Sequence, residues 1–274
     1  RIDLDPATEP LGHDGAGVPV YLHEIWPDAD ELAALAATAT LPDDYRANYG
    51  DIHAGTAEWQ ALPVQGGARF RWDAGSSYIR RPPFFDADFI AGRRDRPDRL
   101  EAARVLAVFG DSLTTDHITP SGEITPDSAA GRHLAAAGVV PAAFNAYTQR
   151  RGNHEVMMRA TFANPRIRNR LVGGTGGRTR HFPDASEMEI HAAAAGYRDE
   201  GVPILVLAGR DYGMGSSRDW AAKGPALLGV AAVIAVSYER IHRANLVGMG
   251  IVPLLFPAGK DMDALGLCGD ESFC

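Results

Sequence analysis

The chain has 274 residues, 45% hydrophobic and 23% charged, the composition of an ordinary globular protein with room for one large or two small domains. Its net charge of −8 gives no general attraction to nucleic acid or to an anionic membrane. No apolar run approaches membrane-spanning length, no signal peptide opens the sequence, and two cysteines, Cys268 and Cys274, cannot form a disulfide framework, so we expect a reducing, cytoplasmic setting.

Residues 1–90 are rich in tryptophan, tyrosine, proline and turn residues and show little periodicity. The exception is 27–36, where a proline followed by acidic residues is typical of a helix start. We expect the tail of a preceding domain and an extended segment that packs on a neighbour. Residues 91–103, which open with a charged run interrupted by a proline, are expected to be a surface linker. A chain that begins at Arg1 and stops abruptly suggests a piece of a longer protein.

A compact α/β domain is expected over residues 104–274. Apolar runs of strand length alternate with helical patterns there, which predicts a layered, mostly parallel sheet with flanking helices. The predicted strands are 104–109, 204–207, 231–236 and 251–256, and the predicted helices are 184–199 and 238–243, with a further helix beginning at Ser216 or Ser217. Residues 173–177, four glycines and a threonine, predict a mobile loop.

The junction between the second strand and its helix, residues 202–220, is the most informative stretch of the sequence. Gly213 and Gly215 allow backbone dihedrals closed to other residues and a close approach of a ligand. If the helix begins at Ser216 or Ser217, its unpaired N–H groups make an anion site, to which Arg218 adds a planar fork suited to a carboxylate. The pattern predicts an anion cradle.

Three familiar loops are disfavoured by the same residues. A dinucleotide fingerprint beginning at Gly213 requires a small residue where Arg218 stands, and a phosphate-binding P-loop requires a lysine that is absent. A nucleophile elbow requires a glycine two residues after its serine, and none follows at that spacing. The sequence therefore disfavours hydride transfer, nucleotide hydrolysis and esterase chemistry.

Two more constellations could carry chemistry. Residues 110–122 follow a predicted strand end, where sites collect in open α/β sheets, and supply the hydroxyls of Thr114, Thr115 and Thr119. In the same stretch Asp116 and His117 could orient one another or a partner, although such a pair is more often a local turn or cap. Residues 149–155 place Arg151 before a glycine, which by itself reads equally well as an exposed basic turn.

Several motifs in order resemble the C-terminal part of the aconitases, of the bacterial and cytosolic iron-regulatory type. They are Thr-Thr-Asp-His-Ile at 114–118, Arg-Gly-Asn-His-Glu-Val-Met-Met at 151–158, Ala-Thr-Phe-Ala-Asn-Pro at 160–165, the run 213–224 and the run 238–250. Residues 19–26 and 76–80 are similar to the segment preceding that domain, so the resemblance covers nearly the whole chain.

The resemblance implies the swivelling β/β/α domain of a hydro-lyase of the tricarboxylic acid cycle, which interconverts citrate and isocitrate through cis-aconitate. Ser216 would be the base that removes a proton beside a carboxylate, Ser217 and Arg218 would bind substrate carboxylate, and Arg151 would bind another. Asp116 would belong to the acid–base network, helped by His117 or Thr119. The family's [4Fe-4S] cluster lies on the larger N-terminal portion, and the whole enzyme is expected to be a monomer.

Cys268 and Cys274 lack cluster-like spacing, so we expect no cluster ligand in this chain and no activity from the chain alone. Three alternatives stay open. An iron–sulfur 2-methylcitrate dehydratase would share these motifs. Messenger RNA binding, as in some relatives, could use a basic strip of Arg151, Arg166, Arg168 and Arg170, against the overall acidity. A separate small subunit, as in isopropylmalate isomerase, fits less well because of the extra 90 residues at the start.

Overall fold

The computed structural model describes residues 3–39, 41–64, 66–94 and 99–274. The chain divides into two compact units, Arg1–Phe70 and Arg71–Cys274. The division falls before the predicted end of the first stretch at residue 90, because residues 76–80 bind a turn of the second unit. Part of the predicted linker, residues 95–98, lies outside the described residues, and the domain limits stay a prediction.

The first unit consists of short elements in sequence. A two-stranded antiparallel pair is followed by four helices: β1 Gly12–His13, β2 Pro19–Val20, α1 Leu22–Ile25, α2 Ala29–Ala39, α3 Pro42–Tyr49 and α4 Ala57–Gln60. The helix predicted at 27–36 is confirmed as α2. It begins with a reciprocal cap, because the N–H of Glu31 donates to Asp28 Oδ1 at 2.8 Å and the N–H of Asp28 to the Glu31 carboxylate at 3.3 Å.

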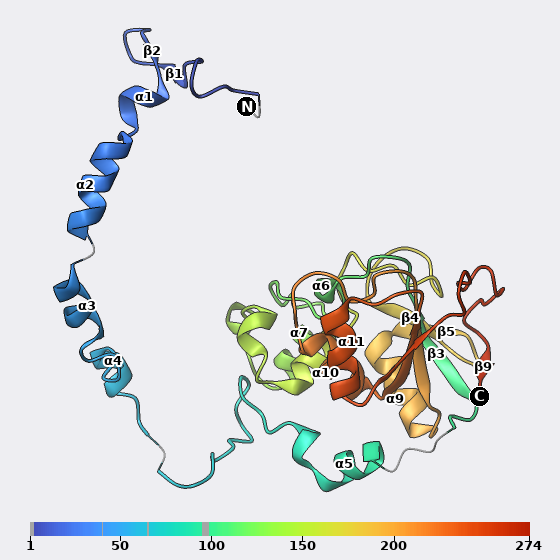
Figure 1. Cartoon of the computed structure of the whole chain (residues 1–274). Coiled ribbons are helices and arrows are strands. Elements are labelled where there is room, and N and C mark those ends of the chain that lie inside the picture. The colour runs from blue at the N-terminus through green and yellow to red at the C-terminus, as the bar shows by residue number, and fades with distance from the viewer. Residues whose placement is uncertain (1–2, 40, 65, 95–98) are drawn as a thin grey trace. The chain divides into compact units, whose positions relative to one another are not determined.

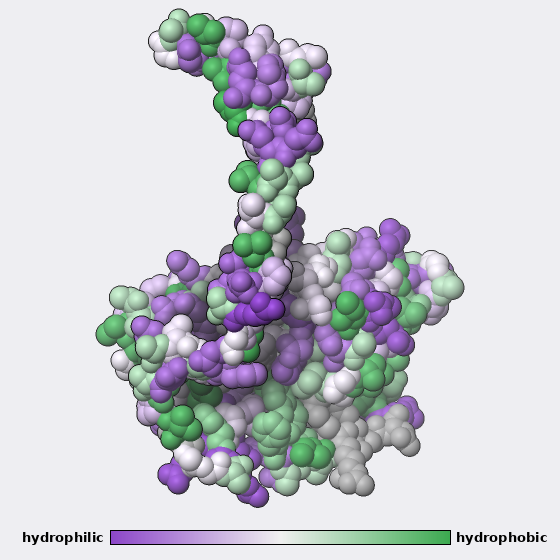
Figure 2. Space-filling view, turned by 60° about the vertical axis from the view of Figure 1, so that its left-hand side comes forward, coloured by the Kyte–Doolittle hydropathy of each residue, from purple (hydrophilic) through white to green (hydrophobic). Residues whose placement is uncertain are grey.

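None of the described residues of this unit is buried, and apolar and polar residues are interspersed along its surface (Figure 2). The unit therefore has no described core of its own, and its packing on a neighbour stays a prediction. In the part of the chain that the structure describes, no helix is both long and apolar enough to cross a membrane.

The second unit is built on a five-stranded sheet in the order β8-β7-β6-β3-β9. The strands are β3 Ala103–Val108, β6 Ile204–Ala208, β7 Val230–Ala235, β8 Val252–Leu255 and β9 Ser272–Phe273. The first four named are parallel neighbours and β9 runs antiparallel to β3. The predicted mostly parallel sheet is thus confirmed, with each predicted strand within a few residues of its place. A separate hairpin joins β4 Arg178–His181 to β5 Ser186–Glu189.

The helices of the second unit lie mainly to one side of this sheet (Figure 1). They are α5 Ala87–Arg94, α6 Thr115–Ile118, α7 Ala129–Ala136, α8 His154–Ala160, α9 Ile190–Asp199, α10 Trp220–Leu228 and α11 Arg240–Gly248, with the 3-10 turns η1 Pro83–Phe85, η2 Pro141–Ala143 and η3 Tyr147–Arg150. The helix predicted at 184–199 is wrong in its first six residues, which form a turn and β5. Residues 186–189 find a strand partner in 178–181, and that tertiary pairing overrides the local pattern.

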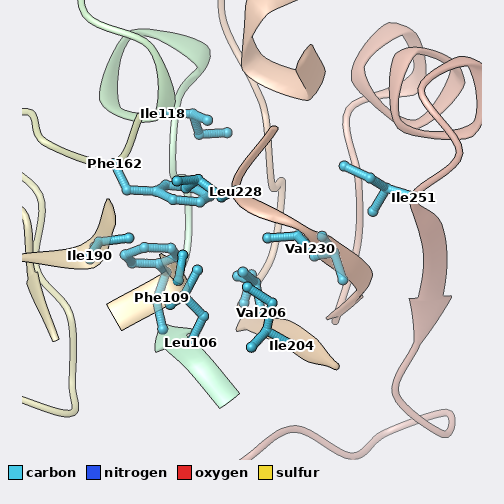
Figure 3. Packing of buried hydrophobic residues seen from close by; sticks show 14 of the residues in the cluster. Leu106, Phe109, Ile118, Phe162, Ile190, Ile204, Val206, Leu228, Val230 and Ile251 are labelled. Carbon is cyan, nitrogen blue, oxygen red and sulfur yellow. The ribbon is translucent and has the colours of Figure 1, made fainter. Parts of the chain in front are cut away.

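Both faces of the sheet are covered, which is why its strands read as continuous apolar runs. In β6, Ile204 and Val206 pack with the helices on one face, whereas Leu205 and Leu207 pack on the other against Phe256 and its neighbours. Figure 3 shows the helix-side core, in which side chains of β3, β6 and β7 meet those of α6, α9 and α10. This core fixes the strand ends from which the candidate site is built.

Candidate active site

Two loops meet at the carboxyl edge of the sheet, one after β3 and one after β6, which are parallel neighbours. The N–H of Gly213 donates to the Leu113 carbonyl at 2.7 Å, and the N–H of Thr115 donates to the Met214 carbonyl at 2.9 Å. The Thr115 hydroxyl then donates to the Ser216 carbonyl at 2.6 Å. Residues 113–115 and 213–216 are therefore bound side by side, at the edge where open α/β sheets place their sites.

Glycine is required twice in the second loop. Gly213 and Gly215 have φ of +80° and +98°, which other residues rarely adopt. Gly213 is also buried under the ring of His242, since an added Cβ would stand 2.0 Å from its Cδ2. The His242 side chain is only 2% exposed, and this burial lowers its pKa to about 4. A neutral imidazole thus supports the loop from below.

The predicted carboxylate-binding arginine is paired with the predicted acid–base residue. Arg218 Nη1 lies 2.6 Å from Asp116 Oδ1 and also donates to the Thr119 carbonyl at 3.2 Å. The Arg218 side chain is 19% exposed and the Asp116 side chain 49%. A guanidinium has five N–H donors in a planar fork, so Arg218 can hold Asp116 and still offer donors to an anion.

The predicted helix start at Ser216 or Ser217 is wrong. Helix α10 begins at Trp220, and Asp219 occupies its N-cap position. Residues 215–218 are held in an irregular conformation by the positive φ of Gly215 and by the bond from Thr115, so they cannot join the helix. Ser216 and Ser217 are exposed in the loop itself, and Arg218 precedes the helix rather than lying in its first turn.

Asp116 and His117 do not orient one another among the described contacts. His117 closes the start of α6, with its Nδ1 2.8 Å from Thr114 Oγ1 and 3.2 Å from the Thr114 N–H, while its own N–H donates to Thr114 Oγ1. The Thr114 N–H donates to Nδ1, so this ring nitrogen is used as an acceptor in the cap. Asp116 instead meets Arg218, and its carbonyl accepts from the Asn164 side chain at 3.0 Å.

Arg151 joins the site from another part of the chain. It is an exposed residue at the end of η3, and it lines a cavity of about 80 Å³ with Thr119, Ser217, Arg218 and two residues that the sequence did not single out, Asp219 and Trp220. A much larger cavity, of about 690 Å³, opens elsewhere and is lined mostly by apolar residues and by none of the predicted site residues. We place the substrate-binding part of the site at the small cavity because the four predicted binding residues line it, whereas Ser216, Asp116 and His117 do not.

The sequence did not separate Arg150 from Arg151. The Arg150 side chain is fully buried, whereas its neighbour is exposed, and no local pattern in Gln-Arg-Arg-Gly distinguishes the two. The four arginines of the predicted basic strip are all exposed, but Arg170 is ion-paired with Asp263.

The described residues contain few side chains suited to a metal centre at this site. Across the described residues, no group of three or more histidine, cysteine or acidic side chains is placed to hold a metal ion. Cys268 and Cys274 are free and exposed. An iron–sulfur cluster requires three or four thiolates, so the described residues of this chain do not fit one.

Comparison with known proteins gives a consistent result. The sequence model of the Aconitase C-terminal domain matches residues 130–259. Aconitate hydratase A of Escherichia coli is 51% identical over 272 residues, covering 99% of this chain and 30% of that protein. Aconitate hydratase A of Thermus thermophilus is 48% identical over 274 residues, covering 100% of this chain and 30% of that protein.

A phosphinomethylmalate isomerase of Streptomyces viridochromogenes is 53% identical over 274 residues, with 99% and 30% covered. The chain thus spans about 30% of the length of these relatives. A solved structure of a 3-isopropylmalate dehydratase from Methanocaldococcus jannaschii matches with a TM-score of 0.29 and 20% identity over 58% of this chain and 65% of that one.

Proposed function

The chain belongs to the family of the aconitase C-terminal domain, and from that premise we propose that it is the C-terminal portion of an aconitate hydratase. The reaction is the interconversion of citrate and isocitrate through cis-aconitate. One observation carries the proposal: the loops after β3 and β6 are bound together at Thr115 and Ser216, Asp116 is ion-paired with Arg218, and Arg218 lines one cavity with Arg151.

In the proposed reaction Ser216 removes a proton from the carbon beside a carboxylate, and hydroxide leaves the adjacent carbon. A double bond forms, which gives cis-aconitate, and readdition of water in the other sense gives the isomer. A serine hydroxyl is a weak acid, so it acts as a base only where cations stabilise its alkoxide and bulk water is excluded. In the proposal Arg218 and Arg151 supply the positive charge, and Ser217 and Thr119, which line the same cavity as the two arginines, complete the carboxylate cradle. Asp116 holds Arg218 in place and serves the acid–base network with His117.

We assign the [4Fe-4S] cluster of the family to the portion of the enzyme outside this chain, because the described residues offer no ligand set for it. The partners that the proposal requires are that N-terminal portion and a small tricarboxylate substrate. A cytoplasmic setting and a monomeric complete enzyme remain predictions.

The proposal is tested by complementation. The purified chain alone should not isomerise citrate, and activity should appear when it is combined with the N-terminal portion of the enzyme after iron–sulfur reconstitution. A chain carrying Ser216→Ala serves as the negative control in the same mixture. Robust isomerisation by the chain alone, or equal activity with the Ser216→Ala chain, would contradict the proposal.

Phosphinomethylmalate is a second candidate substrate, because the chain is 53% identical to a phosphinomethylmalate isomerase, which is as high as its identity to the aconitate hydratases. The third candidate substrate is 2-methylcitrate, which a dehydratase of the same type would use. A methyl group changes binding by only about 1–3 kcal/mol, so the shape of the complete pocket decides among them. Comparing kcat/KM of the complete enzyme for citrate, 2-methylcitrate and phosphinomethylmalate separates the three substrates.

RNA binding is a weaker candidate function than catalysis, because the chain carries a net charge of −8. A salt-dependent mobility shift of an RNA hairpin by the cluster-free enzyme would support it.

A further inference from the structure

Arg150 is a fully buried charge in the turn that carries Arg151. Its guanidinium makes three hydrogen bonds to backbone carbonyls: Nε donates to Phe144 at 2.7 Å, Nη1 to Ser77 at 2.7 Å and Nη2 to Ala143 at 2.6 Å. Its Cζ also stacks 3.9 Å from the centre of the Tyr78 ring. No carboxylate pairs with it among the described residues.

These bonds connect segments that are far apart in the sequence. Ser77 and Tyr78 belong to residues 76–80, more than sixty positions before the turn of residues 143–153. Three further hydrogen bonds bind the same two segments: the Asn153 side chain donates to the Ser77 carbonyl at 2.9 Å, the N–H of Arg80 donates to the Gly152 carbonyl at 2.9 Å, and the Asn145 side chain donates to the Tyr78 hydroxyl. Arg150 is the member of this set that holds both segments with one rigid group.

These contacts between residues 76–80 and 143–153, which we call the clasp, lie directly beside Arg151, the proposed substrate ligand. Gly152 follows Arg151, and a Cβ at Gly152 would stand 2.9 Å from the Tyr78 carbonyl, so residues 76–80 press against the backbone on that side. Arg150 and Asn153 fix the backbone before and after. The exposed residue Arg151 is thus carried by a backbone that is held from both ends, and it lines the cavity with Ser217 and Arg218.

An unpaired guanidinium is costly to bury, and three carbonyl acceptors with a stacked ring are the arrangement that offsets the cost. A hydrophobic residue would fill the same space without that cost. The charge therefore has a role beyond packing. It binds three carbonyls from two segments in a fixed geometry.

We propose that Arg150 is the positioning residue for Arg151, acting by clasping residues 76–80 onto the turn of residues 143–153. This rests on the proposed function, in which Arg151 binds a substrate carboxylate. Since a displacement of about 1 Å at a binding group can cost about 100-fold in rate, loss of the clasp should be felt at the cavity although Arg150 never touches substrate.

The first test measures the clasp in the chain itself, by amide hydrogen exchange. In Arg150→Met, residues 76–80 and 150–153 should exchange about ten-fold faster or more, while β6 and β7 stay protected. Val230→Ala, a buried substitution in β7, is the stability-matched control and should leave the two segments unchanged relative to the rest of the chain. Tyr78→Ala, which strips the stacked ring at a 38% exposed position, serves if Arg150→Met does not fold. Unchanged exchange in the two segments would overturn the proposal.

The second test measures substrate binding in the complete enzyme. Arg150→Met and Arg150→Lys should raise the KM for citrate by about ten-fold or more, in the same direction as Arg151→Met, because an ammonium cannot hold three carbonyls in a plane. Arg166→Met, an exposed arginine, should leave the KM unchanged. A wild-type KM in a variant whose two segments exchange faster would overturn the positioning role. If the wild-type enzyme does not turn over citrate, the proposed function fails while hydrogen exchange still decides on the clasp.

Discussion

The buried histidine under the site loop gives a quantitative prediction of acid sensitivity. His242 has a pKa of about 4 in the folded chain against an ordinary value of 6.5, because burial disfavours its charged form. Between these two pH values the unfolded chain binds a proton at this position and the folded chain does not. Its contribution to stability is therefore complete above about pH 6.5 and is lost as the pH falls toward 4. At about 1.4 kcal/mol for each pH unit, the loss amounts to about 3 kcal/mol.

The assay is urea unfolding of the chain at pH 7 and pH 5, with His242→Gln as the variant. Among the ionisable groups near the ring, Glu239 accepts a hydrogen bond from the His242 N–H, and Tyr212, whose pKa burial raises, lies 5.1 Å from the imidazole between ring centres. Other histidines whose pKa is lowered by burial contribute with the same sign in both proteins, so the difference between the two pH dependences isolates His242. The wild type should lose about 2 kcal/mol more than His242→Gln between pH 7 and pH 5. Equal losses would refute the reasoning.

Two further predictions concern packing and the site. Gly224→Ala in α10 should destabilise the chain by about 1–3 kcal/mol, since the new Cβ would stand 2.0 Å from Thr161 Oγ1. The control is Gly248→Ala in α11, where the space around the added Cβ is open. In the same urea experiment this variant should be neutral or stabilise the chain by about 0.5–1 kcal/mol. Arg218→Lys should lower kcat/KM of the complete enzyme by about 10- to 100-fold, because one ammonium cannot hold Asp116 and a carboxylate together. Arg170→Lys, at an exposed ion pair, should leave kcat/KM unchanged. Equal kinetics for the two variants would contradict the role of Arg218.

The sheet could be predicted from the sequence because its strands are covered on both faces. Continuous apolar runs such as 204–208 leave few other possibilities when helical patterns lie between them. The ends of the helices were harder. Residues 186–189 pair with a strand that no local pattern announces, and residues 215–218 are held out of α10 by bonds to a loop a hundred positions away. Such contacts are tertiary, so sequence propensity does not contain them.

The candidate site was predictable as a set of residue types, and less so as an arrangement. The pairing of Arg218 with Asp116 and the use of His117 as a cap depend on which loops meet. The distinction between Arg150 and Arg151 depends on residues 76–80 lying against their turn. No group of side chains in the described residues is placed to hold a metal ion. The ligands of the family's cluster are proposed to lie in sequence outside this chain.

The most direct test of the central claim is the turnover of citrate by the complete, reconstituted enzyme carrying Ser216→Ala. We predict that kcat falls by about 10²- to 10⁴-fold while the KM for citrate changes little, because the carboxylate ligands Arg151, Ser217 and Arg218 are intact. Ser237→Ala, in a neighbouring loop where the hydroxyl bonds Asp211, should keep kcat near the wild-type value. A Ser216→Ala enzyme that retains wild-type kcat would contradict the claim.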